Sequence, residues 1–169
     1  MENVIWVNEN DMILGEVSRQ EAHEKGILHR IVVIYLFDNT GNILIQERRK
    51  DGLLDHSSAG HVAPGETYLE AAIRELGEEL GVKDVTLTEV GVAKSREVYP
   101  QRKKNRQHIF TIFECIAKPF ALQEDEVKSV FWNNPLRIYQ DMKNDPSHQK
   151  YTGGFKASLE YLLNKKKLT

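Results

Sequence analysis

Residues 60–82, GHVAPGETYLEAAIRELGEELGV, constrain the fold more than any other part of this 169-residue chain. Thr67 and Glu70 have the spacing of a capping box and Gly81 is a natural helix stop, so a helix is predicted over residues 67–80. Apolar residues recur on one side of this helix at about 100° per residue. They form a stripe that is expected to pack on a sheet: Leu69, Ala72, Ile73, Leu76 and Leu80.

Three carboxylates, those of Glu75, Glu78 and Glu79, crowd the C-terminal end of the same helix. Their i, i+3, i+4 spacing places them in one arc, although a helix C-terminus is itself partly negative and like charges at i, i+4 repel. Mg²⁺ prefers such oxygen ligands and commonly bridges to substrate phosphates. The cluster therefore indicates a metal site in which Arg74 holds one carboxylate; the alternative is a solvated acidic face.

The remaining elements follow from apolar alternation, caps and turns. An N-terminal hairpin, a short helix, a second hairpin, three later strands and two C-terminal helices are expected at residues 4–18, 18–25, 30–48, 85–98, 107–117, 126–132, 134–145 and 155–167. Residues 51–65 are interpreted as mostly loop with one short strand, because they hold three Gly and one Pro. This mixture predicts an α+β sandwich, a curved sheet with helices on its faces.

Composition limits the classes of function. The chain is 40% hydrophobic and 28% charged, which fits one globular domain, and its net charge of −2 gives no bulk attraction to nucleic acid or an anionic membrane. The one cysteine, Cys115, has no internal disulfide partner, which indicates a reducing compartment. With no leader pattern and no run of ~20 apolar residues, a soluble cytoplasmic protein is predicted.

The helix belongs to a longer pattern of fixed spacing. Gly60 is followed after five residues by Glu66, and after seven more by REL, one residue, EE, one residue and GV. Such a pattern should recur by chance on the order of once in 10⁸ positions. It is a complete Nudix box, and the chain resembles the Nudix hydrolase superfamily.

The resemblance implies an α/β/α sandwich with a loop–helix–loop catalytic motif. It implies one Nudix domain over residues 1–169, with an N-terminal hairpin and short helix at 1–28, a core at 29–134 and C-terminal helices at 135–169. In the family the box binds a divalent metal for attack of water on a diphosphate. The implied function is a Mg²⁺-dependent hydrolase, with Mn²⁺ as the alternative ion, of a nucleoside diphosphate derivative or another small organic diphosphate.

Carried over by position, each residue of the box acquires an expected role. Glu75, Glu78 and Glu79 are similar to the metal ligands, with Glu75 also similar to the base or base-positioner. Arg74 resembles the residue that orients Glu75, and the backbone carbonyl of Ala59 resembles a further ligand.

Segments 21–50, 57–67 and 120–132 are similar to the branch of the superfamily that contains isopentenyl diphosphate isomerase. Those isomerases hold a metal with histidines that would match His23, His29 and His61, and use a cysteine where this chain has Ala59. Without that thiol the isomerase's proton transfer lacks its acid/base group, so hydrolysis is favoured. A nucleotide-sensing module without turnover is a further alternative, against which the intact glutamates argue.

Other candidates lie outside the helix. His23 and His29 are interpreted as hydrogen-bonded structural residues, and His61 as either structural or substrate-binding. Arg48, Arg49 and Lys50 end a strand and are expected to contact diphosphate unless they form a solvated strand end.

Two further segments complete the candidate site. The basic run 102–106 is interpreted as a solvated loop from which Arg102 could reach substrate. Within the acidic run 124–126, Glu126 is the candidate for an extra metal ligand or the general base. Related enzymes are commonly dimers, so the N-terminal hairpin is a candidate homodimer surface, and the monomer is the alternative. The expected partner is a small-molecule diphosphate, and neither a nucleic-acid polymer nor a membrane is expected.

Overall fold

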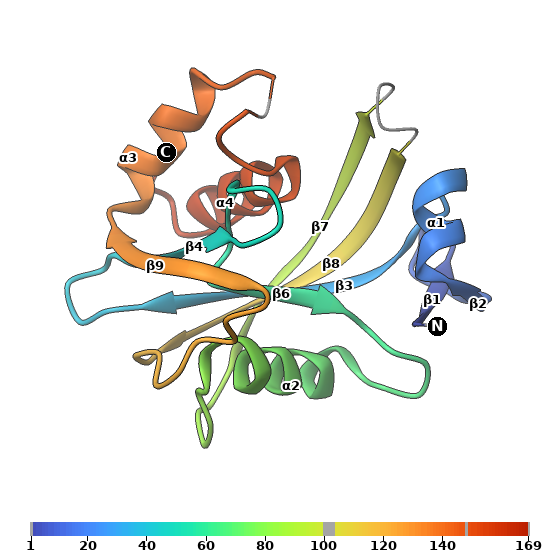
Figure 1. Cartoon of the computed structure of the whole chain (residues 1–169), viewed down its shortest axis with the longest axis horizontal. Coiled ribbons are helices and arrows are strands. Elements are labelled where there is room, and N and C mark those ends of the chain that lie inside the picture. Colours follow the sequence, from blue (N-terminus) through green and yellow to red (C-terminus); the bar gives the residue numbers. More distant parts are fainter. Residues whose placement is uncertain (1, 100–103, 148, 169) are drawn as a thin grey trace.

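The computed structural model describes residues 2–99, 104–147 and 149–168 (Figure 1). Within them the strands are β1 Asn3–Val7, β2 Ile13–Ser18, β3 His29–Phe37, β4 Ile43–Arg48, β5 Leu54–Asp55, β6 Ser58–His61, β7 Thr88–Tyr99, β8 Lys104–Ile116 and β9 Val127–Asn133. The helices are α1 Arg19–Lys25, α2 Tyr68–Leu80, α3 Pro135–Lys143 and α4 Gly153–Lys165. The predicted hairpins, strands and helices are present, and the predicted short strand of the loop is two strands, β5 and β6.

Strand β3 organises a mixed nine-stranded sheet. It pairs in parallel with β8 along its whole length and antiparallel with β6, β1 and the start of β4. Strand β7 continues the sheet beyond β8, β9 and β5 flank β4, and β2 flanks β1. The fold is therefore an α+β sandwich built on an open mixed sheet, as predicted.

The side chains of β3 alternate between two apolar layers, since successive residues of a strand face opposite sides of the sheet. Val32, Ile34 and Leu36 pack with α2 in one core cluster, and Ile31, Val33 and Tyr35 pack with α3 and α4 in the other. In Figure 1, α2 covers one face, α3 and α4 cover the other, and α1 with the β1–β2 hairpin closes one end of the sheet.

The capping box of α2 forms as predicted. Thr67 Oγ1 accepts from the Glu70 backbone N–H at 3.2 Å, and the Glu70 carboxylate accepts from the Thr67 N–H at 2.8 Å. Gly81 ends the helix with a φ of 64°, a left-handed conformation that glycine adopts without strain. These local bonds fix where the carboxylates of the last turn lie.

The predicted apolar stripe of α2 is correct in part. Ala72, Leu76 and Leu80 are buried, whereas Leu69 is 45% and Ile73 is 52% exposed. The stripe prediction was wrong for these two side chains, because the helix is rotated so that Ala71 and Glu79 face inward instead. A carboxylate thus occupies part of the face that hydrophobicity alone would assign to the core.

The N-terminal hairpin is fixed to the rest of the chain through its turn. Asp11 accepts from Arg30 Nε at 2.7 Å and from the Tyr68 hydroxyl at 3.0 and 3.1 Å. In α1, Ser18 Oγ accepts from the Glu21 N–H, but the Glu21 carboxylate binds Lys25, so this cap is one-sided. Among the described helices, none is long and apolar enough to cross a membrane.

Candidate active site

Arg74 organises the acidic end of α2, and all five of its N–H donors are used. Its Nε and one terminal nitrogen bind both oxygens of Glu66, at 2.7 and 2.9 Å. The other terminal nitrogen donates to Glu75 at 2.6 Å and to Glu78 at 3.3 Å, and the His61 carbonyl accepts the fifth bond at 3.0 Å. Because Glu66 anchors one side of the planar guanidinium, the other side presents Glu75 in one orientation.

The three clustered carboxylates differ sharply in burial. Glu79 is buried and the side chain of Glu75 is 14% exposed, whereas that of Glu78 is 56% exposed. Burial, together with the nearby charges of Glu75 and Glu126, raises the pKa of Glu79 to about 8, although Ser58 and the Ala59 N–H stabilise its anion. Burial also raises the pKa of Glu75, against the opposing effect of Arg74. Without a cation, this cluster disfavours its own ionisation.

Gly60 is required by its close approach to Glu75. A Cβ built at Gly60 would lie 1.9 Å from the Glu75 carboxyl carbon and 2.0 Å from Oε1. Strand β6 therefore packs directly against the carboxylate, and the next residue, His61, points to the other side of the strand. The close packing of Glu75 therefore explains, on steric grounds alone, why the box begins with glycine.

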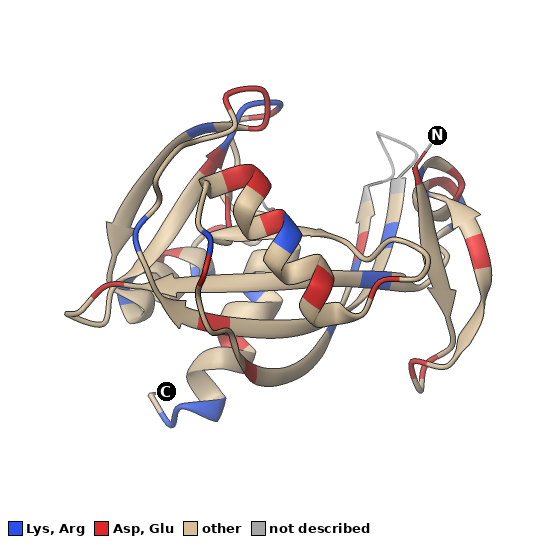
Figure 2. Cartoon of the chain, turned by 90° about the horizontal axis from the view of Figure 1, so that it is seen from below, with Lys and Arg blue, Asp and Glu red and all other residues tan. Residues whose placement is uncertain are grey.

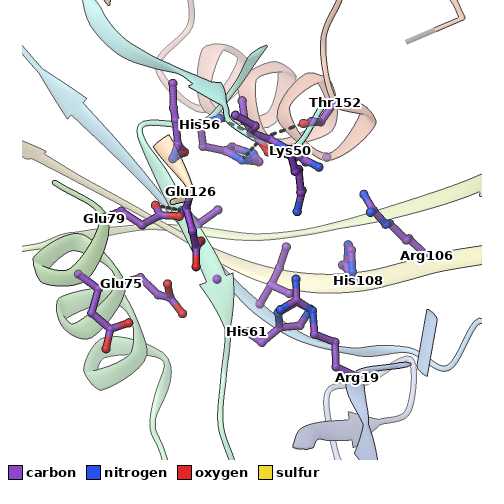
Figure 3. Close-up of a pocket in the computed structure, with 18 of the residues that line it drawn as sticks. Arg19, Lys50, His56, His61, Glu75, Glu79, Arg106, His108, Glu126 and Thr152 are labelled. Atoms are coloured by element: carbon purple, nitrogen blue, oxygen red, sulfur yellow. Dashed lines mark hydrogen bonds and ion pairs between the residues drawn. The ribbon is translucent and has the colours of Figure 1, made fainter. Parts of the chain in front are cut away.

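A pocket of about 460 Å³ lies beside this cluster (Figure 3). Glu75, Glu79 and Glu126 line one side of it, while Arg19, Lys50 and Arg106 line another. The separation of charge suits a ligand that carries both a metal-bound anionic group and further anionic oxygens. Figure 2 shows the acidic bands of α2 around its one basic band.

The cations of the pocket differ in how they are held. Arg48 binds Asp51 at 2.7 Å and Asp55 at 3.1 Å, so its charge is already compensated. Lys50 points into the pocket, where surrounding protein and the charges of Arg48, Arg19 and Arg106 lower its pKa. A cation beside other cations gains most from an anionic ligand.

Three histidines, His23, His61 and His108, line the end of the pocket near Arg19 and Arg106, and His29 lies beside them behind the lining. One ring nitrogen from each lies within 4.8 Å of the others. Burial lowers the pKa of His29, His61 and His108; the charges of neighbouring histidines add to this for His61 and His108, and those of Arg19 and Arg106 add to it for His29. His23 and His29 are therefore not isolated structural histidines.

Not all predicted site residues lie in the pocket. Arg48, Ala59, His61, Arg74, Glu75, Glu78, Glu79 and Glu126 line it. Arg49 does not, because its Nε donates to the Glu124 carbonyl at 2.9 Å. Arg102 lies outside the described residues.

Sequence reasoning missed Arg19, Glu97 and His108 as pocket residues. Arg19 follows the N-cap of a short helix, and Glu97 and His108 are single positions in long strands. No local spacing marks them; they approach the box only through the pairing of β7 with β8 and of β8 with β3.

Comparisons with known proteins agree with this geometry. The family model of the NUDIX domain matches residues 27–153. The chain is 38% identical over 138 residues to the uncharacterized Nudix hydrolase YfcD of Escherichia coli K12, covering 78% of this chain and 73% of that protein. It is 32% identical over 166 residues to isopentenyl-diphosphate Delta-isomerase 2 of Photorhabdus laumondii, covering 95% and 92%.

Solved structures share the fold at lower identity. DR0079 from Deinococcus radiodurans superposes with a TM-score of 0.71 at 22% identity, over 94% of this chain and 98% of its own. The dihydroneopterin triphosphate pyrophosphohydrolase of E. coli superposes with a TM-score of 0.60 at 14% identity, over 80% and 95%. The chain therefore belongs to the NUDIX family and, with a complete glutamate box on α2, is an enzyme of the Nudix pyrophosphohydrolase class.

Proposed function

We propose that this enzyme hydrolyses a diphosphate linkage in a nucleoside diphosphate derivative or another small organic diphosphate, with Mg²⁺ held by Glu75, Glu78 and Glu79. The observation that carries the proposal is the pocket itself. The carboxylates of Glu75, Glu79 and Glu126 face Lys50, Arg19 and Arg106 across a space of about 460 Å³. A diphosphate has the charge and oxygen ligands to join the two sides.

The donor set fits a hard divalent cation, with Mn²⁺ as the alternative to Mg²⁺. The buried Glu79 and the largely buried Glu75 resist ionisation together, because among the described residues Arg74 is the positive charge that compensates them at short range. A bound Mg²⁺ would supply that charge, lower the pKa of water and neutralise charge that develops on phosphate. The Ala59 carbonyl is the proposed additional ligand.

The protein's own groups supply orientation and proton transfer. Arg74 fixes Glu75 through one charge-assisted bond of 2.6 Å and donates to Glu78 from the same nitrogen at 3.3 Å, while Glu66 anchors the other edge of the guanidinium. We assign Glu126 as the group that accepts the proton of the attacking water, with Glu75 as the alternative base, since both line the pocket. Water oxygen then bonds to phosphorus as the P–O–P linkage breaks, giving two phosphate-bearing products.

Isomerisation is disfavoured because this chain has no cysteine at the position where the isomerases use one. Ala59 lines the pocket at the position where the isomerases use a cysteine. The one thiol of the chain, Cys115, is buried in β8 outside the pocket lining, and burial raises its pKa to about 11. A thiol so placed cannot protonate or deprotonate a ligand in the pocket.

Product analysis tests the proposal. The enzyme with Mg²⁺ is incubated with nucleoside diphosphate derivatives, sugar nucleotides and prenyl diphosphates, and the products are identified by mass spectrometry. We expect Mg²⁺-dependent cleavage between two phosphorus atoms of at least one substrate class. Conversion of isopentenyl diphosphate to its dimethylallyl isomer without cleavage would assign the isomerase function instead, and binding without turnover would assign a sensor.

Replacing Lys50 by alanine should raise KM about 10- to 100-fold with a smaller change in kcat. Lys50 points into the pocket, and a charge-assisted bond to phosphate made equally in ground and transition states contributes uniform binding. Arg49→Ala is the matched control, since Arg49 binds the Glu124 carbonyl instead of lining the pocket. Steady-state kinetics of both variants test this prediction. An equal rise of KM in Lys50→Ala and Arg49→Ala would contradict the assignment of Lys50 to substrate binding.

Assembly and location stay predictions. We propose a homodimer through the β1–β2 hairpin because β2 and its turn leave Met12, Ile13 and Leu14 more than half exposed. A monomer mass by light scattering would contradict it.

We also propose a cytoplasmic location, because the single cysteine is a free thiol. Secretion of the protein by cells would contradict this location.

A further inference from the structure

The pocket beside the glutamates of α2 is lined almost entirely by polar side chains. Among its described lining residues, Ile31 and Ala59 carry the apolar side chains, and the rest are charged, amide, hydroxyl or imidazole groups or glycine. Pockets for small molecules are usually lined by hydrophobic and aromatic side chains with a few polar groups. This departure indicates a ligand that has little apolar surface.

Gln46 is a buried polar side chain of this lining that the protein leaves unpaired. It is 5% exposed, and its amide makes no hydrogen bond to another described residue. Leu44, two positions earlier on β4, packs with α2, so Gln46 faces the same side of the sheet as that helix. An enclosed amide without partners is unfavourable, and this one has two N–H donors and a carbonyl acceptor to offer a ligand.

Three further polar side chains complete one wall of the pocket with Gln46. Asp55 lies directly opposite Gln46 in the pairing of β4 with β5, and Thr152 Oγ1 donates to Asp55 at 2.8 Å. Glu97 adjoins them, since a Cβ built at Gly153 would lie 2.7 Å from the Glu97 carboxyl carbon. These four lining residues, here called the polar wall, are Gln46, Asp55, Glu97 and Thr152. Carboxylate acceptors beside an amide suit hydroxyl groups, because each hydroxyl both donates and accepts.

We propose that the organic part of the substrate is a polyol, such as a sugar, whose hydroxyl groups bind the polar wall, and that it carries neither a nucleobase nor a hydrocarbon chain. This inference rests on the proposed function and narrows its substrate. The diphosphate binds at the glutamates of α2, and the polyol extends toward Thr152, which lies across the pocket from Glu75 in Figure 3. Its hydroxyls donate to the carboxylates of the wall and accept from the Gln46 amide.

A nucleobase is the first competing organic part, and it requires an open flat face on which to stack. The aromatic rings of the described lining are imidazoles. His56 is packed against Tyr35 and Phe155, with ring centroids 5.9 and 5.3 Å away. The other three imidazoles of the lining pack against one another at centroid distances of 5.5, 5.8 and 6.2 Å. These rings are therefore covered by each other or by the core.

A hydrocarbon chain is disfavoured for a different reason. Its burial is favourable in proportion to the apolar area that moves from water into apolar surroundings. Against the polar wall this gain is lost, and the carboxylates and the amide would give up water without receiving hydrogen bonds in exchange. The polar wall thus selects for hydroxyl groups and against alkyl groups.

Five diphosphates that differ in their organic part test the inference. Methyl diphosphate is the reference, and ribose 5-diphosphate is the polyol. Cyclopentylmethyl diphosphate keeps the ring size without hydroxyls, uridine 5′-diphosphate adds a base to the ribose, and isopentenyl diphosphate supplies an alkyl chain. With Mg²⁺ we expect kcat/KM for ribose 5-diphosphate to exceed that for the methyl, cyclopentylmethyl and isopentenyl compounds at least about 100-fold, since a site built to bind hydroxyls rejects analogues that lack them. Uridine 5′-diphosphate should be cleaved no faster than ribose 5-diphosphate.

The outcomes separate this inference from the proposed function. A smaller preference for ribose 5-diphosphate over the alkyl compounds, or faster cleavage of uridine 5′-diphosphate, would overturn the polyol while hydrolysis stands. Cleavage of none of the five, methyl diphosphate included, would contradict the proposed function. Dissociation constants measured by calorimetry with Mg²⁺ then test the same ranking without turnover, and equal affinities would overturn the inference.

Gln46→Met tests the polar wall itself. The change keeps an unbranched side chain of similar length and removes the amide, so the ratio of kcat/KM for ribose 5-diphosphate to that for methyl diphosphate should fall about 10- to 100-fold. Thermal melts should show no loss of stability, because the amide has no partner among the described residues. Gln107→Met, on β8 and outside the pocket lining, is the matched control and should keep the wild-type ratio. An unchanged ratio in folded Gln46→Met would overturn the assignment of the wall to hydroxyl binding.

Discussion

Replacing Glu79 by glutamine is expected to lower Mg²⁺-dependent hydrolysis at least about 1,000-fold and to stabilise the metal-free protein at alkaline pH. The activity falls because a hard cation loses an anionic ligand, worth several kcal/mol of transition-state stabilisation. The stability rises because Glu79 is a buried carboxylate at the negative end of a helix, near Glu75 and Glu126. Activity assays and metal-free thermal melts of one preparation give both quantities.

The pH dependence of the free energy of unfolding should distinguish the effect of Glu79 from that of Glu78. Folding raises the pKa of Glu79 from 4.5 to about 8, so the folded protein binds its proton more tightly. The stability that this protonation contributes is complete below the unfolded pKa of 4.5 and is lost as the pH rises through about 8. Between about pH 6.8 and about pH 8.5 the wild type should lose ~1.5 kcal/mol relative to Glu79→Gln.

The chosen range and control make that result specific. Unfolded histidine titrates near 6.5 and folding lowers the pKa of His29, His61 and His108, but these histidines are the same in the wild type and in Glu79→Gln, so their contributions cancel in the difference between the two proteins. Glu78→Gln should also lose activity, but its side chain is 56% exposed, so the pH slope of the wild type should remain. Equal pH slopes in the wild type and Glu79→Gln would contradict the burial of Glu79 without a neighbouring positive charge.

Gly60→Ala should lower kcat about 100-fold with little loss of stability. The new methyl group would lie 1.9 Å from the Glu75 carboxyl carbon, and the end of a flexible side chain can move away while the strand cannot. Displacement of a catalytic group by about 1 Å costs roughly 100-fold. Kinetics at saturating Mg²⁺ and thermal melts measure the two effects.

Gly77→Ala is the matched control in the same motif. A Cβ at Gly77 would meet only the Val82 carbonyl, at 3.8 Å, and alanine is favoured over glycine in a helix interior by about 1 kcal/mol. This variant should melt higher and keep normal turnover. Wild-type kcat in Gly60→Ala would show that the position of Glu75 does not matter for catalysis.

The elements that local chemistry determines were predictable from sequence. Caps at Thr67 and Gly81 fixed the limits of α2, and Asn134 before Pro135 fixed the start of α3. The rotation of α2 about its axis was not predictable. Leu69 and Ile73 match the apolar period, but Glu79 turns inward to accept from the Ala59 N–H at 3.3 Å, a contact set by tertiary structure.

The candidate site was predictable where its residues share one segment, and not where strand pairing assembles it. Glu75, Glu78 and Glu79 form a helical pattern that can be recognised alone. His108 is one residue of an alternating strand, 79 positions beyond His29, and becomes its neighbour only through the parallel pairing of β3 and β8. Even for adjacent residues the sequence alone did not predict which side chain enters the pocket. Lys50 lines the pocket, whereas Arg49 binds the Glu124 carbonyl, and only the fold determines this difference.

Mn²⁺ binding and turnover, measured on the same samples of wild type and Glu79→Gln, test most directly whether the glutamates of α2 hold the catalytic cation. Electron paramagnetic resonance reports free Mn²⁺ during a titration, and product release reports hydrolysis. We expect the wild type to bind Mn²⁺ and turn over, and Glu79→Gln to lose tight binding and hydrolysis together. Undiminished Mn²⁺ binding with normal turnover in Glu79→Gln would show that the cation is held elsewhere.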